Sequence, residues 1–225
     1  MIMPKYYQAY DKRYQQVHAH NLSWSSDNPT PIVWETIADY HLNQWDKMLE
    51  IGCGEGRDAR YLLQKGYDLI ATDVSDEAVS YCVRRDRENE KYYKVMDVLD
   101  NNDKNKYDFI YSVAVVHMFV LDEDRNNFYR YVRSHLNDKG MALIIAMGDG
   151  EEEFDTGIEN AWEDVERVHD TTGMPLSVAK TSCKVVNFDH FLKELDDNRL
   201  EVVSHGLTKS EPDFSVIMYA LVKRQ

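Results

Sequence analysis

Short apolar runs alternate with amphipathic segments along the middle of the chain, and this alternation predicts its architecture. Apolar runs bounded by turn residues favour buried strands, whereas apolar positions spaced by three and four favour helices. The predicted strands are 48–51, 68–72, 92–96, 107–113 and 140–147. The predicted helices are 58–65, 76–89 and 122–136. Strands joined through helices imply right-handed crossovers and a parallel sheet covered on both faces.

Two further strands, 200–207 and 215–223, follow a predicted helix over 187–197. The connection between these strands is too short to hold a helix, so they must run antiparallel. The expected fold class is therefore α/β: a doubly wound, mostly parallel seven-stranded sheet with an antiparallel C-terminal strand pair. Residues 1–225 are expected to form one domain.

Two segments, 1–31 and 149–185, lie outside this pattern and are rich in aromatic residues. The first should contain a tyrosine-rich helix over 5–20, and the second a short helix around 159–169. Long connections in compact domains are often lids or binding loops. Both segments are predicted to form a cap over the active site.

Three glycines at alternate positions, Gly52, Gly54 and Gly56, join the first strand to its helix. A sharp strand-to-helix turn that holds a ligand against its backbone needs residues without a Cβ. The turn also presents free N–H groups and the positive end of the helix dipole. It is predicted to bind a small molecule.

Polar residues follow the next strands at the point where each ends. Asp73 follows the second strand, Asp97 follows the third, and Ser112 to His117 end the fourth. Ligands of open α/β sheets bind beyond these carboxyl ends, where a carboxylate can accept both hydroxyls of a ribose. Either aspartate alone also suits a turn or a helix cap.

The stretch LEIGCGEGRDARYLLQKGYDLIATDVSDEAV resembles motif I through the second strand of class I S-adenosylmethionine-dependent methyltransferases. Within it, GRDARYLLQKGYD is similar to the small-molecule branch around thiopurine and tellurite-resistance methyltransferases. The likeness continues through VMDVLD, YDFIYSVAVVHMF and GMALIIAM, and covers roughly residues 47–147 and 187–223. It implies S-adenosylmethionine as cofactor and methyl transfer as activity.

The resemblance also implies a role for each matching residue. Those that would line the methionine part of the cofactor are Glu50, Gly52, Cys53, Gly54 and Gly56. Those that would hold the adenosine are Asp73 at the ribose, Val74 and Val98 at the adenine, and Asp97 at its amino group. Ser112 and Val113 would present backbone beside the sulfonium.

His117 is the candidate catalytic base or substrate contact, since it follows the fourth strand and imidazole titrates near neutral pH. The alternative is that it packs against the next helix. Methyl transfer depends mainly on alignment of the reacting atoms, and a base acts only where the acceptor loses a proton. Tyr14, Trp24 and Trp162 are the candidate acceptor-binding residues. Tyr14 also suits plain packing on the domain.

Two other functions remain open. A dinucleotide fingerprint, G-x-G-x-x-G, read from Gly52 would place Arg57 at its last position, which disfavours a nicotinamide-dependent oxidoreductase. A catalytically silent, S-adenosylmethionine-binding regulatory protein would carry the same cofactor residues. Methyl release distinguishes it from an enzyme.

Charge and cysteine content narrow the partners. The net charge of −14 disfavours nucleic acid and anionic membranes. The 112–117 segment also lacks the proline pair of enzymes that methylate bases, so a small-molecule acceptor is expected. Three widely spaced cysteines indicate neither a disulfide framework nor a zinc site. The carboxylates at 149 and 151–153 suit a solvated surface, so no metal is expected. A cytoplasmic monomer or homodimer is predicted.

Overall fold

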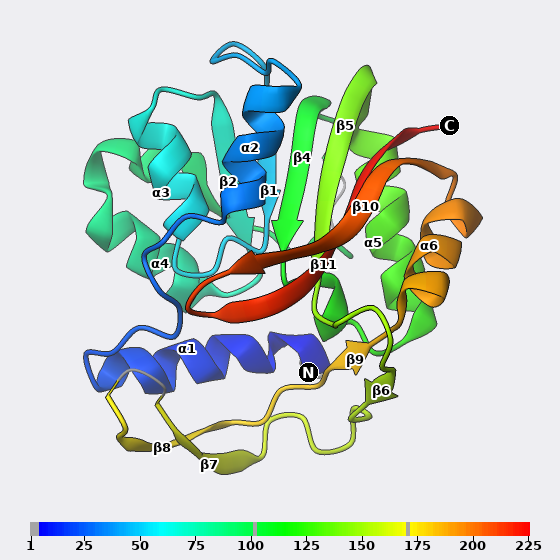
Figure 1. The fold of residues 1–225 in the computed structure, drawn as a ribbon. Helices are drawn as coiled ribbons and strands as arrows, with labels where there is room; N and C mark the ends of the chain where they lie inside the picture. Colours follow the sequence, from blue (N-terminus) through cyan, green and yellow to red (C-terminus); the bar gives the residue numbers. More distant parts are fainter. Residues whose placement is uncertain (1–4, 101–102, 170–171) are drawn as a thin grey trace.

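A computed structural model describes residues 5–100, 103–169 and 172–225 (Figure 1). Its main sheet has seven strands in the order β10-β11-β5-β4-β1-β2-β3. Neighbours from β5 to β3 are parallel, whereas β11 is antiparallel to both β5 and β10. The strands are β1 (Met48–Ile51), β2 (Leu69–Asp73), β3 (Tyr93–Val95), β4 (Tyr107–Val113), β5 (Leu136–Ala146), β10 (Leu200–Ser210) and β11 (Phe214–Arg224). The predicted fold class is confirmed.

Alternate residues of the central strands point into two separate cores. Met48 and Phe109 pack with α2 (Pro31–Asp39), α3 (Arg57–Gln64) and α4 (Asp76–Arg85) on one face. Leu49 and Ile110 pack with α5 (Asp122–His135) and α6 (Phe188–Asp197) on the other. Because both faces of β1 are covered, all four of its residues are buried. The sheet is doubly wound, as its apolar runs predicted.

The segment after β5 differs from its prediction. The helix expected around 159–169 is absent: β7 (Asp164–Val168) pairs antiparallel with β8 (Pro175–Ala179) instead. Two shorter strands, β6 (Phe154–Asp155) and β9 (Lys184–Val185), form a second antiparallel pair. The prediction was wrong because pairing with the next strand in a hairpin overrides a weak local helical pattern, and Val165 and Val168 suit a strand.

The N-terminal segment lies against this hairpin. α1 (Ala9–Ala19) follows the 3₁₀ helix η1 (Tyr6–Gln8) and runs beyond the carboxyl ends of the parallel strands, with β7 and β8 on its far side (Figure 1). Val17 of α1 shares a small apolar cluster with Leu176 and Val178 of β8. Segments 1–31 and 149–185 therefore meet at one edge of the sheet; residues 1–4 and 170–171 of these segments lie outside the described residues.

Candidate cofactor site and active site

The glycine turn adopts a backbone that only glycine accommodates well. Gly52, Gly54 and Gly56 have φ values of +72°, +53° and +77°. A Cβ at Gly52 would stand 2.4 Å from Cγ2 of Val115, and a Cβ at Gly54 would stand 2.8 Å from the hydroxyl oxygen of Tyr14. The turn is thus shaped by conformation and by close neighbours on two sides.

Asp73 ends β2 beside this turn and ties it to the next strand. Its Oδ2 accepts a hydrogen bond from the Gly54 N–H at 2.8 Å, and its Oδ1 accepts one from the Ser75 N–H at 2.8 Å. The side chain is 6% exposed, and burial raises its pKa to about 6, against the opposing effect of these N–H donors. The carboxylate is therefore fixed at the cavity described next.

A narrow cavity opens at the carboxyl ends of β1, β2, β3 and β4. Its volume is about 30 Å³. The residues of the predicted cofactor site that line it are Gly52, Asp73, Val74, Asp97 and Val98. The other lining residues are Tyr7, Ile51, Met96, Val115, Met118 and Phe119.

Of these six residues, Val115 lies in the 112–117 segment that the sequence placed at the crevice, and the other five were missed. Tyr7 comes from the N-terminal segment, and nothing local shows which strand end that segment reaches. Val115, Met118 and Phe119 directly follow β4, where proximity to the predicted crevice was the available signal. Ala114 has a φ of +53°, and this left-handed residue turns the loop back over the glycine turn.

Asp97 is already engaged by the N-terminal segment. Its Oδ2 accepts hydrogen bonds from the Tyr7 hydroxyl at 2.9 Å and from Lys5 Nζ at 3.0 Å. Its Oδ1 accepts one from the Leu99 N–H at 3.0 Å. The oxygen expected to meet an exocyclic amino group therefore has protein partners that a nucleoside would have to replace.

Two buried polar atoms at the end of β4 have no hydrogen-bond partner among the described residues: Ser112 Oγ and His117 Nδ1. Buried polar groups are rarely left unpaired, so such atoms indicate a site for a ligand. His117 lies in the 3₁₀ helix η3 (Val116–Met118) and is 7% exposed. Burial, reinforced by Arg125 and Arg13, lowers its pKa to about 4. The imidazole is neutral at pH 7.

The remaining predicted cofactor residues lie behind the turn and do not line the cavity. Glu50 is buried and accepts a hydrogen bond from the Tyr111 hydroxyl at 3.0 Å. Burial raises the pKa of Glu50 well above its usual range. Cys53 and Val113 are packed in the core cluster that covers the α2–α4 face. In this structure these side chains support the turn.

The three candidate acceptor-binding residues are distributed unequally. Tyr14 reaches the glycine turn, as its distance from Gly54 shows. Trp24 is 37% exposed and stacks over the guanidinium of Arg13, 4.8 Å from its ring centroid. Trp162 touches α1 through its carbonyl, which accepts a hydrogen bond from Lys12 Nζ at 3.1 Å. Tyr14 thus contacts the glycine turn, whereas Trp24 and Trp162 contact residues of α1.

Polar contacts hold α1 against the sheet edge. Asp11 accepts hydrogen bonds from Ser75 Oγ at 2.7 Å and the Glu77 N–H at 3.0 Å, at the start of α4. His18 lies between Glu55 of the glycine turn, 2.8 Å from Nε2, and Glu77, 2.7 Å from Nδ1. Burial alone would lower the pKa of His18, but the two carboxylates raise it above its ordinary value.

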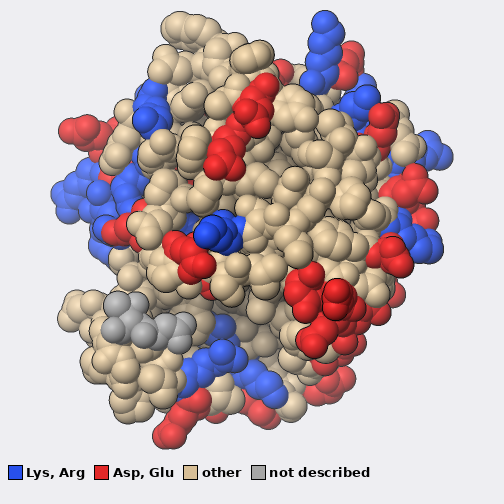
Figure 2. All heavy atoms as spheres, viewed as in Figure 1, with Lys and Arg blue, Asp and Glu red and all other residues tan. Residues whose placement is uncertain are grey.

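Charged side chains of both signs are interspersed on the face seen in Figure 2, with an acidic group at the lower right. Past the end of β5, a second cavity of about 260 Å³ is lined in part by Asp149, Glu152 and Asp213. The Asp149 carboxylate already accepts the N–H groups of Glu151 and Glu152. The described ranges contain no group of three or more His, Cys, Asp or Glu residues placed to hold a metal ion.

Comparison with known proteins identifies the family of this chain. Residues 17–163 match the family described as "Tellurite resistance protein TehB", which is more than half of the chain. The matched segment contains the glycine turn, Asp73, Asp97 and His117. The chain belongs to the TehB family.

Relatives of this TehB-family protein are methyltransferases by name. It is 32% identical over 102 residues to the probable S-adenosyl-L-methionine-dependent methyltransferase TehB of Haemophilus influenzae, covering 44% of this chain and 35% of that relative. It is 30% identical over 165 residues to a yeast (Saccharomyces cerevisiae) tRNA (carboxymethyluridine(34)-5-O)-methyltransferase, covering 68% and 56%. The matches thus span about a third to a half of these relatives.

The fold of the TehB-family chain also matches a solved structure. An S-adenosylmethionine-dependent methyltransferase from Clostridium acetobutylicum superposes with a TM-score of 0.65 at 16% identity, covering 98% of this chain and 99% of that one. The predicted likeness to the tellurite-resistance branch is confirmed, because the family match covers more than half of the chain. No helix in the described part of the chain is long and apolar enough to cross a membrane.

Proposed function

We propose that this protein transfers a methyl group from S-adenosylmethionine to a small-molecule acceptor. The observation that carries the proposal is the meeting of the glycine turn, Asp73 and Asp97 around one cavity at the carboxyl ends of three strands. The unpartnered Ser112 Oγ and His117 Nδ1 lie at the end of the fourth strand of the same edge. These features fit a nucleoside with an attached amino acid.

The residues at this edge would divide the cofactor among them. The turn from Gly52 to Gly56 offers backbone to the methionine part, Asp73 accepts the ribose hydroxyls, and Asp97 accepts the adenine amino group, between Val74 and Val98. When bound, the cofactor supplies a methyl group on a sulfonium. Because the Tyr7 hydroxyl donates to Asp97 Oδ2 at 2.9 Å, Tyr7 has to give up this contact to admit the adenine amino group.

His117 would act on the acceptor side. As a neutral imidazole it can take a proton from an acceptor hydroxyl, amine or thiol, and where no proton is lost it orients the acceptor instead. Its low pKa makes it a weak base, so orientation of the acceptor supplies the larger share of the rate.

The cap supports a small acceptor. α1 and the β7–β8 hairpin close over this edge of the sheet, and Arg13 joins them by donating from Nε and Nη2 to the Ala179 carbonyl at 3.0 and 2.8 Å. Arg13 is 5% exposed and has no carboxylate partner in the described ranges. The guanidinium lies over the rings of Tyr10 and Trp24, and an acceptor with negative charge would give this buried cation an anionic partner. Tyr14, Trp24 and Trp162 are the proposed walls of this space.

One labelling experiment tests the proposal. The protein is incubated with methyl-labelled S-adenosylmethionine and, separately, with the small-molecule, RNA and protein fractions of a cell extract. Label in the small-molecule fraction supports the proposal, and label in RNA instead would show that the acceptor resembles that of the yeast relative. Cofactor binding without transfer to any fraction would favour a silent regulatory protein. We also propose that the protein acts in the cytoplasm.

A further inference from the structure

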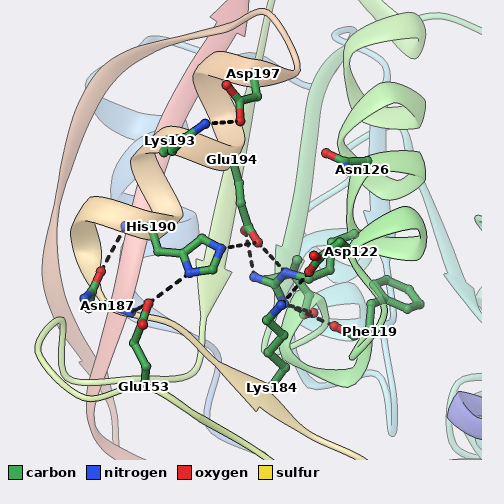
Figure 3. A network of polar contacts seen from close by, with 12 residues as sticks. Phe119, Asp122, Asn126, Glu153, Lys184, Asn187, His190, Lys193, Glu194 and Asp197 are labelled. Carbon is green, nitrogen blue, oxygen red and sulfur yellow. Dashed lines mark hydrogen bonds and ion pairs between the residues drawn. The ribbon is translucent and has the colours of Figure 1, made fainter. Parts of the chain in front are cut away.

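A buried ion pair connects α5 and α6 directly behind the loop that carries His117. Arg125 is 1% exposed, and its Nε and Nη2 donate to the two oxygens of Glu194 at 2.6 and 2.7 Å. The Tyr129 hydroxyl donates to the same carboxylate at 2.7 Å. Figure 3 shows Glu194 extending from α6 toward this contact. Both oxygens of Glu194 thus accept hydrogen bonds. Nη1 of Arg125 takes no part in this ion pair.

That free end of Arg125 holds the loop after β4. Nη1 donates to the Val116 carbonyl at 2.8 Å and to the Phe119 carbonyl at 3.3 Å, one on each side of His117. Residues of this loop contribute to two parts of the site. Val115 and Phe119 line the nucleoside cavity, whereas His117 has the unpartnered Nδ1. The Arg125 guanidinium therefore contacts the backbone that positions both the cavity wall and His117.

Stability alone does not explain this arrangement. Removing two charges from water costs several kcal/mol per ion, and a buried ion pair is often no more stabilising than apolar side chains of the same volume. A planar guanidinium, however, presents five N–H donors in a rigid fork and fixes several acceptors at once. The geometry suits a device that holds a loop in one position.

We propose that Arg125 is a positioning residue: it holds the 115–119 loop in place, with Glu194 fixing the guanidinium. The inference rests on the proposed function only for the meaning of the nucleoside cavity and His117. The network also reaches the segment after β5, because His190 lies 3.6 Å from Glu194 and 2.9 Å from Glu153 (Figure 3). A change in that segment can therefore reach the loop through His190, Glu194 and Arg125 in turn.

The test uses two variants of the full chain. Arg125→Lys keeps the charge beside Glu194, but a single ammonium cannot span the carboxylate and both carbonyls. Asn198→Ala is the control, since Asn198 follows α6 and donates to Asn126 Oδ1 of α5 at 2.7 Å and to the Glu194 carbonyl at 2.8 Å without touching the loop or the Glu194 carboxylate. Thermal unfolding shows that both variants fold and ranks their loss of stability.

Two readouts are then compared. The NMR resonances of the His117 ring report the position of the loop without any cofactor, and calorimetry measures the affinity for S-adenosylhomocysteine. We expect Arg125→Lys to shift the His117 resonances and to weaken binding about tenfold, or ~1.4 kcal/mol. Asn198→Ala should leave the resonances in place and the affinity within about twofold of wild type.

Either of two results would overturn the inference: wild-type His117 resonances and affinity in Arg125→Lys, or equal losses in both variants. If Arg125→Lys does not fold, Glu194→Gln replaces it, with the same direction expected because the amide cannot hold both guanidinium nitrogens as acceptor. A wild-type protein that fails to bind S-adenosylhomocysteine would instead refute the proposed function. The His117 resonances would still decide the role of Arg125.

Discussion

The hydroxyl oxygen of Tyr14 lies 2.8 Å from the point at which a Cβ on Gly54 would stand. Tyr14 belongs to α1, and Gly54 is the middle glycine of the cofactor turn, so this contact joins the N-terminal helix to the predicted methionine site. Burial and the nearby Asp73 carboxylate raise the pKa of Tyr14 well above its usual range, and the phenol stays protonated.

Gly54→Ala tests how closely α1 is fitted to this turn. The methyl group would push Tyr14 away and would add the strain of a left-handed alanine, about 1–2 kcal/mol. Gly173→Ala is the matched control, because Gly173 has a φ of +69° and no atom of the described residues lies within 4 Å of its Cβ position. We expect both variants to lose stability in urea unfolding, but only Gly54→Ala to lose S-adenosylhomocysteine affinity. Equal affinities of Gly54→Ala and Gly173→Ala for S-adenosylhomocysteine would show that the contact with Tyr14 does not affect binding at the turn.

The neutral His117 predicts a pH dependence of stability. Its folded-state pKa of about 4 lies below the unfolded value of about 6.5, so the unfolded chain binds the proton first. Stability from this residue is fully present above about pH 6.5 and is lost as the pH falls toward 4, by about 1.4 kcal/mol per unit. His117→Gln should flatten this part of the curve in urea unfolding at pH 7 and pH 5. An unchanged slope would mean that His117 is solvated.

His18 predicts the opposite pH dependence for α1. Its pKa is raised by Glu55 and Glu77, so its contribution is complete below the unfolded value of about 6.5 and is lost as the pH rises through the folded value. Hydrogen-exchange protection of α1 should therefore fall between pH 6 and pH 9, relative to that of α5. His18→Gln should remove the difference. If α1 and α5 lose protection equally in the wild type, the contact does not control the helix.

Much of the sheet and of the candidate cofactor site could be proposed from local patterns. The apolar runs at 48–51 and 107–113 are buried on both faces, which produces a continuous hydrophobic strand that is easily recognised. The glycine turn and Asp73 are equally visible, because a left-handed backbone and a strand-end carboxylate each demand particular residues.

The cap and the cavity walls were less predictable because they depend on contacts between distant segments. In the cap, β7 and the next strand, β8, form a hairpin in place of an expected helix, with Val165 opposite Val178. Tyr7 reaches Asp97 across 90 residues of sequence, and no local pattern encodes that meeting. Arg125 reads as an ordinary surface arginine in a charged helix until Glu194 is placed beside it.

The central claim is that the edge formed by the glycine turn and Asp73 binds S-adenosylmethionine. Calorimetric titration of S-adenosylhomocysteine into wild type and Asp73→Ala tests it most directly, with Asp86→Ala as a control, because Asp86 accepts hydrogen bonds from the Asn89 and Tyr93 side chains and does not line the cavity. Loss of a buried charged acceptor costs about 1.5–3 kcal/mol per hydrogen bond. Wild type and Asp86→Ala should bind one equivalent, and Asp73→Ala should bind at least about tenfold more weakly. Absence of binding to the wild type, or equal binding to Asp73→Ala, would contradict the account.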